Sequence, residues 1–177
     1  MIIFETNRLI VRRYELADAD NFFLLNGDEE VTRYIRPAKT RVESDAFLKY
    51  NIAFADEQPL YGRWAVIEKV SGVFVGSFAL IPVEGSLNMQ LGYALLPAAW
   101  GKGYATELTL AGLDYIFHKT DLETIYAYTE MPNIPSQKVL LKTGFKRKRE
   151  QIQGEKTLVE FAMTKKEYLL NVPMTSN

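Results

Sequence analysis

The stretch that decides the fold is Leu95-Leu96-Pro97-Ala98-Ala99-Trp100-Gly101-Lys102-Gly103-Tyr104-Ala105-Thr106. It runs from an apolar strand pattern through a glycine-rich turn directly into a helical pattern. Glycines let a backbone approach a phosphate closely, and the first amides of a helix have no acceptor within it. The helix dipole adds partial positive charge at the same place. The stretch therefore predicts an anion site built from the N–H groups of Gly101, Gly103 and Ala105.

The turn alone leaves more than one interpretation open. An ordinary tight connection between a strand and a helix has the same Gly-x-Gly spacing. The Walker phosphate motif needs Ser or Thr after its lysine, whereas Lys102 is followed by Gly103. A dinucleotide fingerprint needs Gly or Ala three residues after its second glycine, where this chain has Thr106. Both failures disfavour a nucleotide-binding protein.

Hydrophobic periodicity on either side of the turn predicts an α/β chain. The predicted strands are residues 6–14, 63–69, 73–81, 87–95, 124–129, 145–151 and 157–164. The predicted helices are residues 15–26, 41–55, 103–119 and 135–143. Turn signals at 71–72 and 84–86 predict that the second to fourth strands form an antiparallel meander. The predicted order of elements is βααβββαβαββ.

Length and composition limit the class of protein. With 177 residues, 47% of them hydrophobic, the chain can bury one core, so we expect one domain over 1–172 and a flexible tail at 173–177. A formal net charge of -1 provides no field to recruit nucleic acid or a membrane, and neither is an expected partner. No signal-peptide pattern and no membrane-length apolar run are present, so we expect a cytoplasmic protein. The absence of Cys and the single His118 exclude disulfides, a cysteine nucleophile and a histidine-rich metal site.

Three segments, one before the turn, one around it and one after it, resemble a known family. Gly92 to Glu107 reads Gly-Tyr-x-Leu-x-Pro-x-x-Trp-Gly-Lys-Gly-Tyr-Ala-Thr-Glu, and Asn133-x-x-Ser136 followed by Gly144-Phe145 comes later. This pattern is similar to the acetyl-CoA motif of GNAT N-acetyltransferases, in particular the RimJ/RimL-like branch that acetylates the N-termini of ribosomal proteins. The opening 5–12, Glu-Thr-Asn-Arg-Leu-Ile-Val-Arg, resembles the usual start of that branch. The resemblance covers nearly the whole chain.

The resemblance implies an α/β (α+β) fold with a GNAT-type mixed, mostly antiparallel central sheet of about six to seven strands and helices on both faces. It also implies acetyl-CoA as cosubstrate and no metal. The pantetheine arm would lie in a V between the strand before the turn and the next strand, bonded to main-chain groups. The implied cofactor-binding residues are Tyr93, Ala94, Leu95, Leu96, Gly101, Lys102, Gly103, Tyr104, Ala105, Thr106, Asn133 and Lys138.

The implied reaction is direct attack of an amine on the thioester within a ternary complex. Gln90 stands where many members have a Glu general base, so water or Glu84 is a candidate proton acceptor. Leu140 stands where many members have a Tyr general acid, and Ser136 is instead a candidate proton donor to the thiol. Asn133 would contact the pantetheine arm or the acetyl group. Helix capping is the alternative role for both Asn133 and Ser136.

The acceptor is expected to be a peptide or protein N-terminal α-amine or a small-molecule amine. Family analogy places the walls of its cleft at Tyr34, Arg36, Tyr61 and Trp64, with core or rim packing as the alternative. A weak base favours an α-amine, because near pH 7.4 about 300 times more of it is neutral than of a lysine amine. A catalytically weak acyl-CoA-binding sensor or scaffold is the alternative function, and monomer or homodimer is the expected state.

Overall fold

The structure is a computed structural model that describes residues 1–171. Its strands are β1 (Ile2–Glu5), β2 (Leu9–Arg13), β3 (Gly62–Glu68), β4 (Phe74–Pro82), β5 (Met89–Leu95), β6 (Thr124–Glu130), β7 (Lys146–Gln153) and β8 (Lys156–Thr164). Its helices are α1 (Ala19–Asn26), α2 (Glu29–Thr32), α3 (Arg41–Glu57), α4 (Tyr104–Lys119), α5 (Ile134–Lys142) and α6 (Lys165–Asn171). Two short 3-10 turns, η1 (Leu16–Asp18) and η2 (Pro97–Ala99), precede α1 and α4. The tail expected at 173–177 lies outside the described residues.

One sheet contains all eight described strands in the order β1-β2-β3-β4-β5-β6-β8-β7. Every neighbouring pair is antiparallel except β5 and β6, which are parallel. The predicted mixed, mostly antiparallel sheet is therefore confirmed. It has one strand more than the six to seven expected, and the additional strand is β1 at the edge of the sheet.

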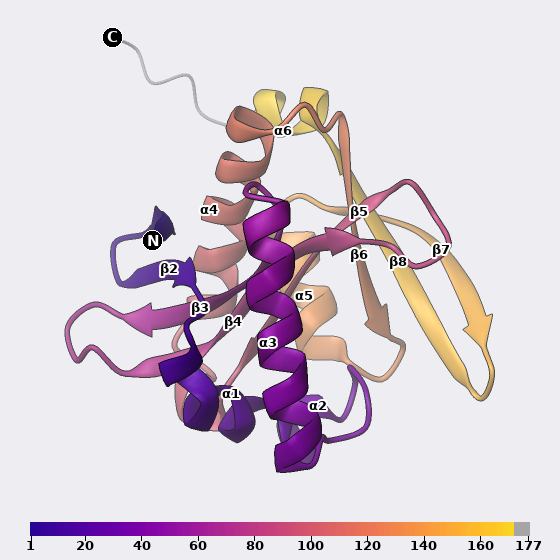
Figure 1. Cartoon of the computed structure of the whole chain (residues 1–177). Coiled ribbons are helices and arrows are strands. Elements are labelled where there is room, and N and C mark those ends of the chain that lie inside the picture. Colours follow the sequence, from indigo (N-terminus) through magenta and orange to yellow (C-terminus); the bar gives the residue numbers. More distant parts are fainter. Residues whose placement is uncertain (172–177) are drawn as a thin grey trace, which may run out of the picture.

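The helices cover both faces of the sheet, as predicted (Figure 1). On one face α4 and α5 pack on a large core that includes Phe78, Leu108 and Phe161. On the other face a smaller core joins the sheet to α1, α2 and α3 through residues such as Phe22 and Leu48. The helix α3 begins at a capping box in which the Thr40 side chain and the Glu43 side chain each accept from the other's main chain. The middle of the sheet, as at β4, is thus buried on two sides.

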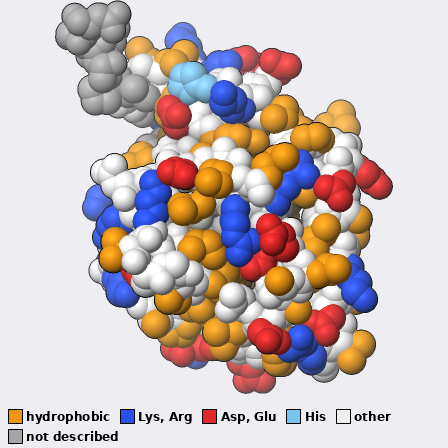
Figure 2. All heavy atoms as spheres, turned by 60° about the vertical axis from the view of Figure 1, so that its left-hand side comes forward, with side chains coloured by type: hydrophobic (Ala, Val, Ile, Leu, Met, Phe, Trp, Pro, Cys, Tyr) orange, Lys and Arg blue, Asp and Glu red, His pale blue; other side chains and the backbone are white. Residues whose placement is uncertain are grey.

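The surface carries charges of both signs. On the face shown in Figure 2, Lys and Arg side chains lie among Asp and Glu side chains and do not gather in one basic area. The basic run at 146–149 lies on β7, at the edge of the sheet, and its side chains are exposed. Among the described residues no helix is long and apolar enough to cross a membrane.

Candidate active site

The two parallel strands at the middle of the sheet separate almost as soon as they meet. β5 and β6 share a single register pair, Gln90 with Tyr126, while β5 stays paired with β4 along its whole length. The strands therefore form a V that opens toward the end of β5, where the glycine-rich turn begins. This is the splay that the resemblance predicted.

The register of β5 decides which of its main-chain groups face the V. Leu96 donates its N–H to Val75 O at 2.9 Å, and groups alternate along an antiparallel ladder, so Ala94 also pairs with β4. Tyr93 and Leu95 consequently face the V. The Leu95 carbonyl already accepts a hydrogen bond from the Trp100 indole at 2.7 Å. The expectation that Ala94 offers main-chain groups to the V is corrected by this alternation.

The glycine-rich turn has the backbone that an anion site needs. Gly101 and Gly103 have φ angles of 72° and 80°, in the left-handed region that favours glycine. Nothing lies within 4 Å of where a Cβ on Gly101 would sit, so the space in front of the turn is open. The helix α4 begins at Tyr104, and its first amides have no intrahelical acceptor. The turn thus offers main-chain donors, the positive end of a helix dipole and room for a phosphate.

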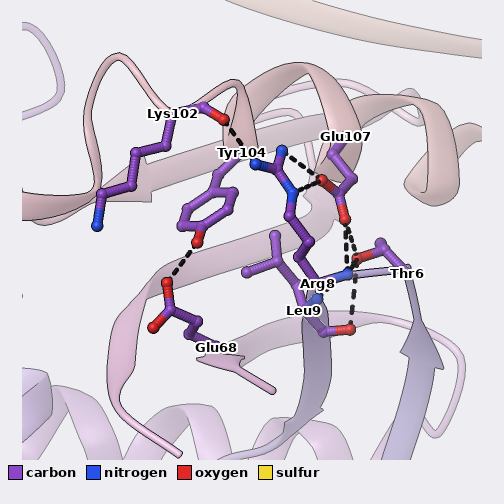
Figure 3. Close-up of polar contacts among 7 residues, drawn as sticks. All are labelled: Thr6, Arg8, Leu9, Glu68, Lys102, Tyr104 and Glu107. Carbon is purple, nitrogen blue, oxygen red and sulfur yellow. Dashed lines mark hydrogen bonds and ion pairs between the residues drawn. The ribbon is translucent and has the colours of Figure 1, made fainter. Parts of the chain in front are cut away.

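A set of contacts from the start of the chain holds this turn in place (Figure 3). Arg8 donates to the Lys102 carbonyl at 2.9 Å and pairs with Glu107 of α4 at 2.6 Å. Thr6 donates its hydroxyl to the same carboxylate at 2.5 Å. We call Thr6, Arg8 and Glu107 the turn clamp. Because the clamp joins the β1–β2 turn to both sides of Gly103, it fixes the first turn of α4 on the sheet.

The side chain of Tyr104 lies beneath the turn. The Arg8 guanidinium stacks 4.5 Å from the centroid of its ring, and its hydroxyl donates to Glu68 at the end of β3 (Figure 3). Tyr104 is 5% exposed, so it packs and does not reach outward. The Lys102 side chain, by contrast, is exposed beside the turn, and Lys138 is exposed on α5. Leu96 caps η2 and half-buried Thr106 lies in the first turn of α4.

A cavity of about 550 Å³ occupies the V and continues onto the face covered by α1 and α2. Of the residues predicted from the sequence, it is lined by Tyr34, Arg36, Glu84, Gln90, Tyr93, Ala94, Asn133 and Ser136. The part of the predicted cofactor slot at Tyr93, Ala94 and Asn133 is therefore continuous with the predicted acceptor cleft. The other predicted residues do not line the cavity: Leu95, Leu96, Gly101, Lys102, Gly103, Tyr104, Ala105, Thr106 and Lys138 of the cofactor set, and Tyr61 and Trp64 of the acceptor set.

Two hydroxyl groups meet on the α5 side of the cavity. Tyr93 Oη and Ser136 Oγ are 3.2 Å apart, within hydrogen-bond distance. Burial raises the pKa of the Tyr93 hydroxyl, so it stays protonated at neutral pH. Asn133 caps α5, because its side-chain oxygen accepts from Ser136 N at 3.3 Å. The capping alternative is thus the observed contact of Asn133, and the Tyr93 side chain is a site group that sequence reasoning missed.

The carboxylates that line the cavity belong to Glu84 and Glu130. Neither stands at position 90, where many GNAT members have a Glu general base. The Gln90 amide only donates to Pro82 O, at 3.4 Å. Glu130 lines the cavity but forms an ion pair with Lys156. Glu84 lines the cavity, is exposed, and has no ion pair within residues 1–171. Glu84 is therefore the carboxylate of the cavity that is not engaged in an ion pair within the described residues.

The acceptor wall differs from the prediction at one strand. Trp64 is 0% exposed and stacks on Phe78 with ring centroids 6.1 Å apart, in the core under α4. Side chains alternate along β3, so Trp64 points to one face and Arg63 points to the other, where it lines the cavity. Tyr61 packs half-buried against the same core as Trp64. Trp64 and Tyr61 are therefore corrected to packing residues, and Arg63 replaces them on the wall.

Comparisons with known proteins agree with this geometry. Residues 8–146 match the acetyltransferase (GNAT) domain family. An uncharacterized N-acetyltransferase, p20 of Bacillus licheniformis, is 31% identical over 92% of this chain and 96% of its own. In structure, a RimL ribosomal L7/L12 α-N-protein acetyltransferase solved with coenzyme A has a TM-score of 0.80 at 14% identity, covering 93% and 98% of the two chains. A spermidine N-acetyltransferase of Vibrio cholerae, solved with CoA and spermine, has a TM-score of 0.75 at 20% identity, covering 91% and 98%.

The fold and the match define an acetyltransferase. The chain belongs to the GNAT family and is an N-acetyltransferase, which transfers an acetyl group to an amine. The predicted enzyme class and the resemblance to the GNAT family are thereby confirmed.

Proposed function

We propose that this chain transfers the acetyl group of acetyl-CoA directly to the primary amine of an acceptor with a low pKa, such as a peptide N-terminus or a small molecule. The observation that carries the proposal is the break in β5–β6 pairing beside a left-handed glycine turn and a helix N-terminus. Main-chain groups of Tyr93 and Leu95 would hold the pantetheine arm, and the turn from Gly101 to Ala105 would hold the pyrophosphate. These groups fit the cosubstrate.

Acetyl-CoA supplies the acetyl group as an activated thioester. Formation of the N–C bond and cleavage of the C–S bond release one proton from the amine and require one for the thiolate, so the step balances. Ser136, which lies within hydrogen-bond distance of the protonated Tyr93 hydroxyl, is the candidate donor of the thiolate proton. Glu84, directly or through water, is the candidate acceptor of the amine proton. An exposed carboxylate is a weak base, which favours amines that are already partly neutral.

Thiol release from acetyl-CoA with a panel of amines tests this function. The panel comprises peptides with a free N-terminus, N-terminally blocked lysine peptides, polyamines and aminoglycosides. We expect α-amines and other low-pKa amines to exceed lysine peptides in kcat/KM by about 100-fold, in line with their neutral fractions near pH 7.4. Activity on lysine with none on α-amines contradicts the proposal. Tight acetyl-CoA binding without turnover on any amine would favour the sensor or scaffold function.

The turn clamp yields a separate prediction about the cosubstrate. We expect Arg8→Gln to raise KM for acetyl-CoA by about 5- to 10-fold, because it removes the bond to Lys102 O and half of the ion pair to Glu107. The effect on kcat should be smaller, since Arg8 does not line the cavity. Steady-state kinetics with acetyl-CoA varied at saturating amine measure both constants.

Arg147→Gln is the matched control for this variant. Arg147 has the same side-chain exposure, 47% against 46%, and an ion pair of the same length, 2.6 Å, but it lies on β7. It should leave KM for acetyl-CoA unchanged. Equal KM values for Arg8→Gln and the wild type would mean that the clamp does not position the turn.

A further inference from the structure

Three cations surround one aromatic ring at the acceptor end of the cavity. The ring belongs to Phe47 of α3, and its centroid lies 5.3 Å from the Arg36 guanidinium carbon, 5.6 Å from that of Arg63 and 5.0 Å from Lys39 Nζ. Both arginines line the cavity, and they come from separate elements, the segment after α2 and the strand β3. Two guanidinium groups are thus held against one ring and directed at the same space.

No carboxylate of the described residues neutralises these two arginines. Arg36 donates only to the Asn26 side-chain oxygen, and its buried Nε has no hydrogen-bond partner within residues 1–171. Arg63 has neither an ion pair nor a side-chain hydrogen bond there. Arg12 and Arg13, on the neighbouring strand, differ because they pair with Asp18 at 2.7 Å and Asp56 at 3.0 Å. The chain therefore neutralises the partly buried arginines beside the cavity but leaves those within it unpaired.

The arrangement of two unpaired arginines is electrostatically unfavourable. Burial, and next the charge of Arg36, lower the pKa of the Arg63 guanidinium to about 10. Burial also lowers the pKa of Arg36. The guanidinium stays protonated at neutral pH, so two like charges face each other with reduced hydration. An anion that accepts hydrogen bonds from both groups would relieve this repulsion, and guanidinium groups suit the oxygens of a carboxylate or a phosphate.

We propose that the acceptor amine carries a carboxylate or phosphate group, and that Arg36 and Arg63 bind this anion while the amine points toward the V. The inference rests on the proposed function and names its substrate class. The carboxylate of Glu84 lines the other part of the same space, so an acceptor with an amine at one end and an anion at the other matches the charges of the cavity. Polyamines and aminoglycosides, which carry several positive charges, would meet the arginines in repulsion.

Matched amine pairs test the proposal, each with one anionic and one neutral member. The pairs are amidated Ser-Glu and Ser-Gln peptides and amidated Ser-phosphoserine and Ser-Ser peptides, so the members of each pair present the same kind of α-amine and the two arms separate a carboxylate from a phosphate. For at least one pair we expect the wild type to prefer the anionic member in kcat/KM by about 10-fold or more. In Arg63→Gln that ratio should fall by a similar factor, and Arg63→Lys should recover part of it. Arg33→Gln, an exposed arginine outside the cavity, should keep the wild-type ratio.

Two further measurements separate this inference from the proposed function and from misfolding. Calorimetric titration of the preferred anionic amine onto the CoA-bound enzyme needs no turnover, and its Kd should rise about 10-fold or more in Arg63→Gln. The Tm of this variant should equal or exceed that of the wild type, because an unpaired charge is removed. No preference for the anionic member of any pair, with no anionic amine binding, overturns the inference even if amines are acetylated. Retention of the wild-type ratio, or a Tm lowered by several degrees, in Arg63→Gln overturns the role given to the arginine.

Discussion

Replacing Gly103 by glutamate is expected to lower kcat/KM for acetyl-CoA by about 100-fold or more. The new carboxylate would lie at the first turn of α4, where the cosubstrate's phosphates are proposed to bind, and juxtaposed like charges cost several kcal/mol. The φ of 80° at this position adds strain for any residue with a Cβ, of about 1–2 kcal/mol. Thiol release and direct titration of CoA measure the two consequences.

Gly154→Glu separates the charge at the turn from the strain. Gly154 also has a left-handed φ, 60°, and nothing lies within 4 Å of its would-be Cβ, but it lies between β7 and β8. We expect Gly154→Glu to lose about as much stability as Gly103→Glu does and to bind CoA with the affinity of the wild type. If Gly103→Glu bound CoA as tightly as Gly154→Glu does, the phosphates would not lie on this turn.

Replacing Gly112 by alanine is expected to destabilise the protein by about 2 kcal/mol, although alanine is the better helix former. A Cβ at this position of α4 would lie 2.3 Å from Phe78 Cζ. Phe78 is 0% exposed and cannot retreat, since Phe4 packs edge-on against it with centroids 5.3 Å apart and Trp64 stacks on it. Urea unfolding measures the change in the free energy of unfolding.

The double variant Gly112→Ala with Phe78→Leu tests the cause. Phe78→Leu alone leaves a cavity and costs stability, but the smaller side chain also makes room for the new methyl group. The double variant should therefore be more stable than the sum of the two single changes predicts, by about 1 kcal/mol. Additive effects would mean that the contact with Phe78 is not what excludes a side chain at Gly112.

The sequence predicted the features that depend on local pattern. The glycine turn, the seven longer strands and the helices on both faces follow from periodicity and from residues with special backbone preferences. β1 was missed because four residues at a sheet edge offer too little alternation to detect, and its pairing depends on a turn fixed by the distant Glu107. α2 and α6 are likewise too short to show a helical period.

The site was predicted less completely, because the partner of each strand and the direction of each side chain are set by tertiary structure. The main-chain groups of Ala94 cannot bind the pantetheine arm, because the register of β5 against β4 pairs them with β4. No local sequence pattern contains that register. The Tyr93 hydroxyl could not be placed against Ser136 without knowing how α5 packs. The error at Trp64 could have been avoided from the sequence. Side chains alternate along β3, which could have indicated that Trp64 faces the core and Arg63 faces the cavity.

The single register pair between β5 and β6 also bears on self-association. A sheet ordinarily has two margins with unpaired backbone groups, and such margins invite another chain to add a strand. This sheet has four, because the V opens two more inside it. The outer margin at β7 carries the run Lys146-Arg147-Lys148-Arg149, and charge of one sign there discourages strand addition, while the margin at β1 is only four residues long. The inner margins lie between helices of both faces, so the protein can keep unpaired strand groups for a ligand without offering them to a second copy of itself.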